Sequence, residues 1–407
     1  MGAFGAAAVL SLAREGAQVV GIDKFDPPHD KGSTHGETRA TRIATFESEK
    51  LVASARRSIE ICRRLEEDLV ADGLAAGNPP TGLFRRCGGI VFGRPHAVGE
   101  GYYGVDNPFL ATVAAADQHG VEHDLVTAGQ IRARWPMFNP GDGEEAYFEP
   151  GAGVLFPERI VEAQLALAAR KGAHLAVNET ARFFESNTNT VRVTTVTADG
   201  ETKAYEAGKL IITAGPWIQQ VLPQEYEDLF TLQRLTLFWY GLTDAARAEY
   251  ESYRDMPRYG WAYDTGEPFG KGVYGFPALD GPDGGIKIAC DNGTPVESPE
   301  AVDRHVTEAE KDGMYESIHR RLPGLSRECL KALTCLYTMT RDNKPIIGFL
   351  PGQPNVLAIS ACNGAGFKHS VAFGEAAAQL ALRGSSDIDL RSFGVDRLLT
   401  PLASGTA

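Results

Sequence analysis

The chain has 407 residues, of which 43% are hydrophobic and 23% charged, and its formal net charge is -13 at pH 7. Because a single hydrophobic core stops growing near about 250–300 residues, this length favours two packed units. The negative charge argues against a nucleic-acid surface. No apolar run approaches the ~18 residues of a membrane-spanning helix. We therefore expect a cytoplasmic protein with no nucleic-acid or membrane partner.

Periodic apolar residues predict alternating helices and strands along much of the chain. Helical spacing occurs at residues 3–15, 50–72, 108–119, 157–171, 307–322 and 374–384. Short buried runs predict strands at residues 17–23, 88–93, 191–198, 209–215 and 356–362. The first helix has no basic leader of a signal peptide, so we assign it to the fold. Residues 230–295 alternate apolar with polar positions among many glycines and prolines, which is typical of an antiparallel sheet.

This order predicts a mixed α/β protein whose two domains interrupt one another. We expect a Rossmann-like nucleotide-binding domain and a second domain built on an antiparallel sheet. The first would comprise residues 1–75, 145–220 and 325–407, and the second residues 76–144 and 221–324. Six cysteines are present, none in a CxxC pair, and their spacing fits neither a zinc site nor a disulfide framework. We expect reduced thiols and no metal.

The first five residues, MGAFG, match the end of the dinucleotide fingerprint G-x-G-x-x-G. Gly2 and Gly5 fall on its second and third glycines, and Asp23 ends the next strand, where a carboxylate binds a ribose hydroxyl. The alternative is a plain glycine-rich start. The first glycine and the strand before it are missing from the pattern. Either the natural start lies upstream, or the sheet lacks its first strand and has an open position that weakens nucleotide binding.

Eight short segments carry a more specific signal by their order and spacing. They are DKFDPPHDKGSTHGETRATR (23–42), RWP (134–136), FEPGAGVLFPE (148–158), TAGPW (213–217), YGFP (274–277), GIK (285–287), CLYT (335–338) and GAGFK (364–368). In these segments the chain resembles the monomeric sarcosine oxidase family, which includes N-methyltryptophan oxidase and pipecolate oxidase. The resemblance implies a monomer that binds FAD under a roofing sheet. It also implies oxidation of a secondary amino acid by oxygen to an imine and hydrogen peroxide.

The resemblance assigns a role to each of four polar residues. Cys335 would bond covalently to the flavin, where the alternative is a buried free thiol. Arg42 and Lys368 would hold the substrate carboxylate, since a guanidinium suits a carboxylate; the alternative for Arg42 is a surface salt bridge with Glu37. Lys287 would activate oxygen as a fixed positive charge, where the alternative is a strand lysine that points to solvent.

Aromatic residues are the candidate walls of the pocket, because aromatic faces attract methylammonium-like groups. These are Tyr274, Tyr337 and Trp261, with core packing as the strong alternative for Trp261. The remaining residues implied to bind the cofactor are Gly2, Gly5, Asp23, Ser33, His35, Gly36, Thr38, Arg39, Ala181, Ala214, Gly215, Trp217, Gly364, Gly366, Phe367 and Lys368. We assign His35 to the cofactor and not to acid–base catalysis, and no residue is identified that takes the proton of the substrate amine.

Two positions depart from the family pattern. Small-substrate members have histidine where Ala365 and Asp291 stand. Alanine opens volume, so we expect a substrate bulkier than sarcosine. Three rival functions remain open: a dehydrogenase that passes electrons to a carrier, a non-catalytic relative with a truncated nucleotide site, and an NAD-dependent dehydrogenase. Lys287 argues against the first, and the retained reacting-centre residues argue against the second. The third gives no reason for Cys335, Lys287 or Lys368.

Overall fold

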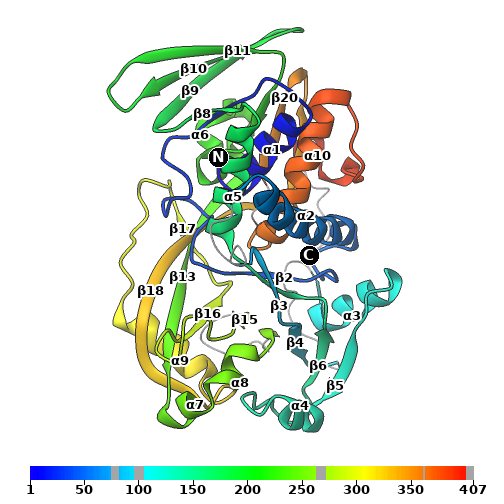
Figure 1. Cartoon of the computed structure of the whole chain (residues 1–407), viewed down its shortest axis with the longest axis vertical. Coiled ribbons are helices and arrows are strands. Elements are labelled where there is room, and N and C mark those ends of the chain that lie inside the picture. Colours follow the sequence, from blue (N-terminus) through cyan, green and yellow to red (C-terminus); the bar gives the residue numbers. More distant parts are fainter. Residues whose placement is uncertain (75–81, 96–104, 263–271, 361–362, 400–407) are drawn as a thin grey trace.

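The computed structural model describes residues 1–74, 82–95, 105–262, 272–360 and 363–399. It is a mixed α/β structure, as the sequence predicts (Figure 1). The helices are α1 (Ala3–Arg14), α2 (Val52–Ala71), α3 (Pro108–Gln118), α4 (Ala128–Arg134), α5 (Pro157–Arg170), α6 (Ile218–Val221), α7 (Asp244–Ala248), α8 (Tyr250–Asp255), α9 (Glu308–Ile318), α10 (Ser370–Arg383) and α11 (Asp396–Leu399). None of the helices in these ranges is both long and apolar enough to span a bilayer.

The upper half in Figure 1 contains two small parallel arrangements with helices packed against them. Strand β1 (Val20–Ile22) pairs in parallel with β8 (His174–Ala176). Strand β12 (Leu210–Ile212) pairs in parallel with β20 (Gln353–Ser360), which pairs antiparallel with β19 (Ile346–Leu350). Within the described ranges, β1 and β12 each have a strand on one side only. An open sheet position is one of the two alternatives that the sequence analysis gives for this end of the fold.

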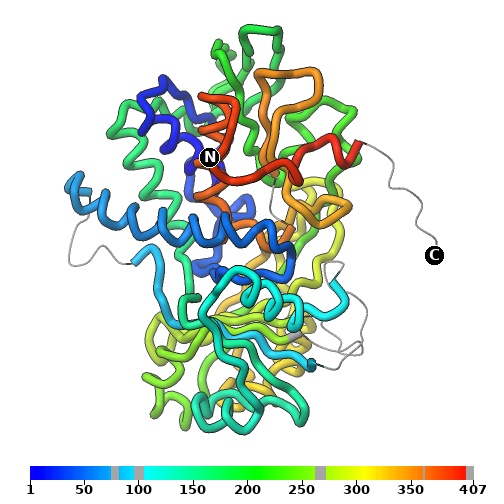
Figure 2. The backbone as a smooth tube through the Cα atoms, turned by 90° about the vertical axis from the view of Figure 1, so that its right-hand side faces the viewer, coloured from blue at the N-terminus to red at the C-terminus, as the bar shows by residue number. Residues whose placement is uncertain are grey.

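Helix α1 packs between α5 and α10 through small side chains. Its Ala6 and Ala7 are almost fully buried. A Cβ on Gly374 of α10 would lie 2.3 Å from the Cβ of Ala7, so the glycine permits this close approach. Figure 2, turned by 90°, shows α2 lying across this helical layer. The layer therefore holds the start of α1 in a fixed place.

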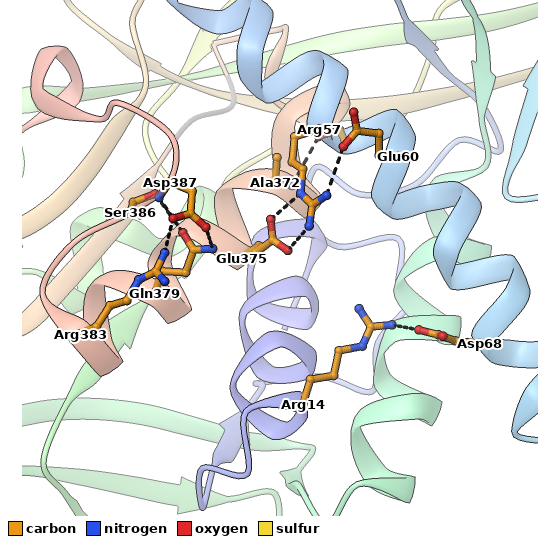
Figure 3. Close-up of polar contacts among 11 residues, drawn as sticks. Arg14, Arg57, Glu60, Asp68, Ala372, Glu375, Gln379, Arg383, Ser386 and Asp387 are labelled. Carbon is orange, nitrogen blue, oxygen red and sulfur yellow. Dashed lines mark hydrogen bonds and ion pairs between the residues drawn. The ribbon is translucent and has the colours of Figure 1, made fainter.

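Ion pairs join α2 to two other helices of this layer (Figure 3). Arg57 of α2 binds both carboxylate oxygens of Glu375 on α10, at 2.8 and 2.7 Å. Arg14 of α1 pairs with Asp68 of α2. Since these pairs are partly exposed, each stabilises by no more than about 1 kcal/mol. Their main effect is to fix how the helices are oriented relative to one another.

The lower half contains a nine-stranded sheet. Strand β13 (Phe230–Leu242) runs antiparallel to β18 (Leu325–Thr340) on one edge and to β16 (Ile286–Cys290) and β17 (Thr294–Val296) on the other. The sheet continues through β15 (Gly272–Gly275), β14 (Arg258–Ala262), β4 (Gly89–Gly93), β6 (Glu145–Glu149) and β5 (Asp124–Thr127). All neighbours are antiparallel except β4 and β14. The sheet is mainly antiparallel, and the domain boundaries drawn from the sequence stay a prediction.

Two smaller sheets complete the fold. Strands β9 (Glu179–Ser186), β10 (Val191–Thr197) and β11 (Thr202–Ala207) form the meander at the top of Figure 1. Strands β2 (Arg39–Thr41), β7 (Gly153–Leu155) and β3 (Phe84–Arg86) form the other. Within the predicted sheet region 230–295, residues 244–255 instead form α7 and α8. Thr243 caps the first of these by accepting a hydrogen bond from the amide of Ala246 at 3.3 Å.

Candidate active site

A tight loop before β2 gathers around Lys287 of β16. The Nζ of Lys287 donates to the carbonyl oxygens of Gly36 at 2.5 Å and Thr38 at 2.8 Å. Its ammonium also lies 5.3 Å from the ring centroid of Trp239 and 4.9 Å from that of Phe276. Burial, and then the charge of Arg39, lower the pKa of Lys287 well below its ordinary value. The side chain is 3% exposed, so the alternative of a solvent-facing lysine is wrong.

Gly36 and Arg39 explain why the loop can close so tightly. Gly36 has a φ of +98°, and a Cβ there would lie 2.6 Å from a methyl group of Leu237, so only glycine fits. Arg39 donates to the carbonyl oxygens of Thr38 at 2.9 Å and Ser33 at 2.8 Å. Its guanidinium therefore holds the loop together through these two hydrogen bonds, and its role in binding the cofactor stays a prediction.

Cys335 lies in the middle of β18 and faces this loop. Its Sγ is 3.7 Å from Nη2 of Arg39 and 3.7 Å from the carbonyl oxygen of Ser33. The residue is 1% exposed and is a free thiol. It packs with Leu237, Trp239 and Ala289. Cys335 therefore shares one face of the large sheet with the aromatic neighbours of Lys287.

The two predicted carboxylate-binding cations meet at a residue that the sequence analysis missed. Glu47 accepts from Nη2 of Arg42 at 3.2 Å and from Nζ of Lys368 at 2.8 Å. All three side chains are less than one-tenth exposed. Burial alone would raise the pKa of Glu47, but Lys368 and Arg42 hold it well below its ordinary value. Glu37 instead pairs with Lys331, so the proposed Arg42–Glu37 surface bridge is wrong.

Tyr274 and Tyr337 form a hydroxyl pair on the same face of the sheet. Their oxygens are 3.2 Å apart, and the hydroxyl of Tyr337 donates to Oδ1 of Asp291 at 3.3 Å. Burial raises the pKa of Tyr274 to about 12. Burial also raises the pKa of Asp291 to about 7, and the nearby charge of Glu47 acts in the same direction. The two tyrosines thus lie together, with a carboxyl group beside them, and their role as a pocket wall stays a prediction.

Trp261 does not join this wall. It is 1% exposed and stacks on Phe92 with ring centroids 3.7 Å apart. Its indole Nε1 donates to Glu144 at 3.3 Å. Trp261 therefore belongs to the core of the large sheet, because its ring fills space between hydrophobic layers. The core-packing alternative is correct.

The predicted dinucleotide residues surround a cavity of about 1150 Å³. Gly2 and Gly5 stand at the start of α1, where backbone N–H groups favour a phosphate. Asp23 accepts from the amide of Phe25 at 2.9 Å and pairs with the ammonium group of Met1. Residues of both β1 and β12 line the cavity. The other predicted cofactor residues that line it are Ser33, Ala181, Ala214, Gly215 and Trp217.

The remaining predicted residues lie on the turn before α10 and in the loop before β2. Gly366, Phe367 and Lys368 form a single helical turn, Gly366–His369, that packs on β2. Gly364, just before it, has a φ of +71°, which favours glycine. Thr38 and His35 are buried, and burial with the charge of Arg39 lowers the pKa of His35 to about 3. His35 is therefore neutral, which agrees with a binding role.

Unsatisfied polar atoms test whether a flavin nucleotide fits here. Buried polar groups in native proteins almost always have hydrogen-bond partners. Four of the buried side-chain atoms that have none within the described part of the chain lie in this region: Ser33 Oγ, His35 Nε2, Thr38 Oγ1 and Thr338 Oγ1. They belong to the loop that meets Lys287 and to β18, which carries Cys335. The residues present fit FAD, whose polar groups would satisfy such atoms.

Glu158 is a second residue that the sequence analysis missed. At the start of α5, its Oε1 accepts from the amides of Gly36 at 2.6 Å and Glu37 at 3.0 Å. The left-handed backbone of Glu37, with a φ of +71°, points both amides at one carboxylate. Glu158 does lie in the quoted segment 148–158, but no local pattern predicts contacts with residues so distant in sequence.

Comparisons with known proteins identify the family of this chain. The FAD dependent oxidoreductase family matches residues 1–380. The monomeric sarcosine oxidase of Streptomyces avermitilis is 34% identical, over 98% of this chain and 96% of its own length. That of a Bacillus species is 30% identical, over 97% and 94%. The N-methyl-L-tryptophan oxidase of Escherichia coli is 33% identical, over 97% of each chain.

Solved structures show the same fold at lower identity. NikD, an amino acid oxidase of nikkomycin biosynthesis, has a TM-score of 0.77 at 20% identity, over 97% of this chain and 95% of its own. L-proline dehydrogenase from P. horikoshii has a TM-score of 0.75 at 18% identity, over 98% and 95%. These two show the fold alone. From the family match and the sequence relatives together, this chain belongs to the FAD-dependent oxidoreductase family, in the group of monomeric sarcosine oxidases and N-methyltryptophan oxidases.

Proposed function

We propose that the protein oxidises the carbon–nitrogen bond of an amino acid that carries a secondary amine, either N-methyl or cyclic. The observation that carries this proposal is the meeting of Arg42 and Lys368 on one buried carboxylate, beside the loop that binds Lys287. Two buried cations are suited to the carboxylate that every amino acid has. The sequence relatives act on N-methyl amino acids by their names, which supports the same substrate class.

The residues that would hold FAD fall into two groups. Gly2, Gly5 and Asp23 would take the nucleotide end, and the loop from Ser33 to Arg39 would take the flavin end. When bound, FAD supplies the acceptor for two electrons from the carbon–nitrogen bond and their transfer to oxygen, which yields an imine and hydrogen peroxide. We also propose a covalent bond from Cys335 to the flavin, because this thiol faces the loop.

The donors of Arg42 and Lys368 that Glu47 does not use would hold a substrate carboxylate. An arginine has five N–H donors and an ammonium group has three. Together they offer more donors than a single carboxylate can accept. Arg42 uses Nη2 and Lys368 uses one contact of 2.8 Å toward Glu47. The substrate carboxylate would bind alongside Glu47 and fix the direction in which the amine points. The hydroxyls of Tyr274 and Tyr337 would line the pocket.

Lys287 would serve the reaction with oxygen. Burial and the charge of Arg39 lower the pKa of Lys287, whereas its contacts with two carbonyl oxygens and two aromatic faces act in the opposite direction and favour the protonated form. A preorganised positive charge favours the negative charge that develops as oxygen is reduced. Lys287 therefore supports an oxidase over a dehydrogenase that uses a carrier.

The substrate would be bulkier than sarcosine. The carbonyl oxygen of Ala365 lies 3.3 Å from Nζ of Lys368, so this position adjoins the carboxylate-binding end of the pocket. The alanine side chain is a single methyl group, where small-substrate members have an imidazole. The volume this leaves suits a cyclic or aromatic N-alkyl amino acid.

The test is oxidation by the purified, FAD-loaded protein of a panel that runs from sarcosine to N-methylphenylalanine and pipecolate. Oxygen uptake and peroxide are measured together, with the amide of each amino acid as the matched control that lacks a carboxylate. We expect one peroxide for each oxygen consumed, slow turnover of the amides, and a monomer by size-exclusion chromatography. Electron transfer to a dye without peroxide, or equal turnover of acids and amides, would contradict the proposal.

A further inference from the structure

Arg258 begins β14 and is a buried cation that the proposed reaction does not use. The residue is 3% exposed, and within the described ranges its Nε and Nη2 have no hydrogen-bond partner. Burial, and then the charge of Arg42, lower the pKa of Arg258 to about 10, so the guanidinium stays protonated at neutral pH. Because a buried charge with unused donors is costly, this side chain is a candidate to bind an anion.

Arg258 lies on the face of the large sheet that carries Tyr274. Its neighbours along β14, Tyr259 and Trp261, belong to the hydrophobic core on the other face. Since side chains alternate along a strand, Arg258 and Gly260 face away from that core. Gly260 pairs directly with Tyr274 of β15, and residues paired in this way share a face. Arg258 therefore stands beside the tyrosines that are the candidate pocket wall.

An open space lies over Gly260. A Cβ built on this glycine would meet no atom of the described residues within 4 Å. Tyr274 of β15 flanks the position on one side, and Val91 of β4 flanks it on the other. Arg258 precedes Gly260 by two residues on the same face. A substrate side chain that passes Tyr274 therefore has room to reach Arg258.

The segment that follows Arg42 is packed on this face of the sheet. Val91 lies in one hydrophobic cluster with Ala44 and Ile43. Glu149 of β6 accepts hydrogen bonds from the amide of Ile43 at 2.7 Å and from that of Ala44 at 3.2 Å. These contacts hold the chain directly after Arg42 against strands β4 and β6. An amino acid whose carboxylate is bound by Arg42 is therefore on the same face as the space over β14.

Gly89 lets the guanidinium of Arg258 lie over β4. Arg258, Gly89 and Glu149 form one row across three neighbouring strands. A Cβ on Gly89 would lie 2.7 Å from Nε of Arg258, so a larger residue would displace the guanidinium. Glu149 is not a hydrogen-bond partner of Nε or Nη2, because its oxygens accept from two backbone amides and the hydroxyl of Tyr147.

We propose that Arg258 binds an acidic group on the side chain of the substrate, which is therefore an N-alkyl amino acid with two carboxylates. This inference rests on the proposed function and narrows its substrate class. Arg42 and Lys368 hold the carboxylate next to the amine. The guanidinium of Arg258 holds the second carboxylate, for which its planar array of donors is suited. The space over Gly260 takes the atoms between them.

The test compares acids with their neutral isosteres. Oxygen consumption by the FAD-loaded protein is measured with N-methyl-L-glutamate and N-methyl-L-aspartate, and with the side-chain amide of each, which keeps the shape without the second charge. Sarcosine and N-methylphenylalanine complete the panel. The series is repeated with Arg258→Met and with the control Arg254→Met, since Arg254 is a partly exposed arginine of α8. Binding of glutarate and of its monoamide, read from the shift in flavin absorbance, needs no turnover.

We expect the wild-type kcat/KM of at least one acid to exceed that of its amide by about 10²-fold, because the amide leaves the buried cation unpaired. Arg258→Met should lower the value for the acid to that for the amide and leave sarcosine nearly unchanged. Arg254→Met should keep the wild-type preference. Glutarate should bind more tightly than its monoamide to the wild-type protein and no more tightly to Arg258→Met.

Equal wild-type values for acid and amide in both pairs would overturn the inference, and this comparison decides the question even where the variant does not fold. An Arg258→Met protein that keeps the preference would also overturn it. So would one that slows acid, amide and sarcosine by the same factor, because that result describes a structural role. Failure of the proposed function looks different: the wild-type protein would then oxidise no member of the panel.

Discussion

The Nζ of Lys368 lies 2.8 Å from Oε1 of Glu47, and neither side chain is more than 9% exposed. Breaking a buried ion pair leaves an uncompensated charge, here two cations without their anion. We expect Glu47→Gln to lower the free energy of unfolding by about 3 kcal/mol. Urea unfolding measures this, with Glu308→Gln as the control, since Glu308 pairs with Lys311 at the surface. Equal effects of the two substitutions would contradict the prediction.

The ion pair of Glu47 with Lys368 should make the stability of the folded protein depend on pH. Because its partners hold the pKa of Glu47 below its ordinary value, the contribution is fully present above about pH 4.3, the value in an unfolded chain. It should be lost as the pH falls below that value, where the unfolded chain binds a proton that the native protein does not. Glu47→Gln should therefore flatten the acid limb of a stability–pH curve, and an unchanged limb would count against the assignment.

The proposed covalent bond between Cys335 and the flavin can be tested by the colour of the protein after acid precipitation. We expect acid precipitation of the FAD-loaded wild-type protein to leave the yellow colour in the pellet, and that of Cys335→Ser to release it. Cys290→Ser is the matched control, because Cys290 is also a buried cysteine of the large sheet. The absorbance of pellet and supernatant decides. If the wild-type supernatant is yellow, the flavin is not covalent; if Cys290→Ser also releases it, Cys335 is not the site.

A substitution at Lys287 should slow the reaction of the reduced flavin with oxygen and leave the binding of substrate unchanged. We expect Lys287→Met to slow the reaction of the reduced, FAD-loaded protein with oxygen by about 10²–10³-fold. Stopped-flow mixing with oxygenated buffer measures this rate. Lys331→Met is the control, because its Nζ lies 4.8 Å from the ring centroid of Trp239 but pairs with the partly exposed Glu37. A Lys287 variant that reoxidises at the wild-type rate would remove this residue from the oxygen step.

Ala365 should set the size preference. We expect Ala365→His to shift the ratio of kcat/KM for N-methylphenylalanine over sarcosine at least about tenfold toward sarcosine, because lost volume disfavours the larger side chain. Ala204→His on β11 is the control, since Ala204 is exposed on the meander and does not line the cavity. A ratio that does not move, or a wild-type protein that prefers sarcosine, would show that this position does not select size.

The elements predicted from periodicity agree with the structure where hydrophobic spacing is strong. The predicted helices 50–72 and 157–171 correspond to α2 and α5, and the predicted strand 191–198 to β10. The final predicted strand, 356–362, corresponds to β20 up to Ser360; residues 361 and 362 lie outside the described ranges. The helices α7 and α8 were not predicted, because α7 begins at a short polar cap, Thr243, inside a segment whose apolar residues alternate as in a sheet.

The candidate site was only partly predictable, for a physical reason. Family motifs named the residues that would touch substrate or cofactor, and the structure brings Arg42 to Lys368 and Cys335 to the loop of Gly36. The motifs did not name Glu47 or Glu158, whose roles depend on contacts across the fold. The position of Trp261 in the core was not predictable for the same reason, because an aromatic residue in a strand fits a pocket wall and a core equally well.

The long pairing of β13 with β18 has a consequence for the order of folding. It joins Phe230 to Thr340 and Leu242 to Leu325, segments far apart in the chain, and such pairings form slowly. A register slip of one residue would turn Cys335 and Tyr337 to the opposite face of the sheet. Only a chain that has completed this pairing in the correct register presents the thiol to the loop. If the proposed flavin bond forms, the molecules that carry covalent flavin are therefore those in which this sheet paired in the correct register.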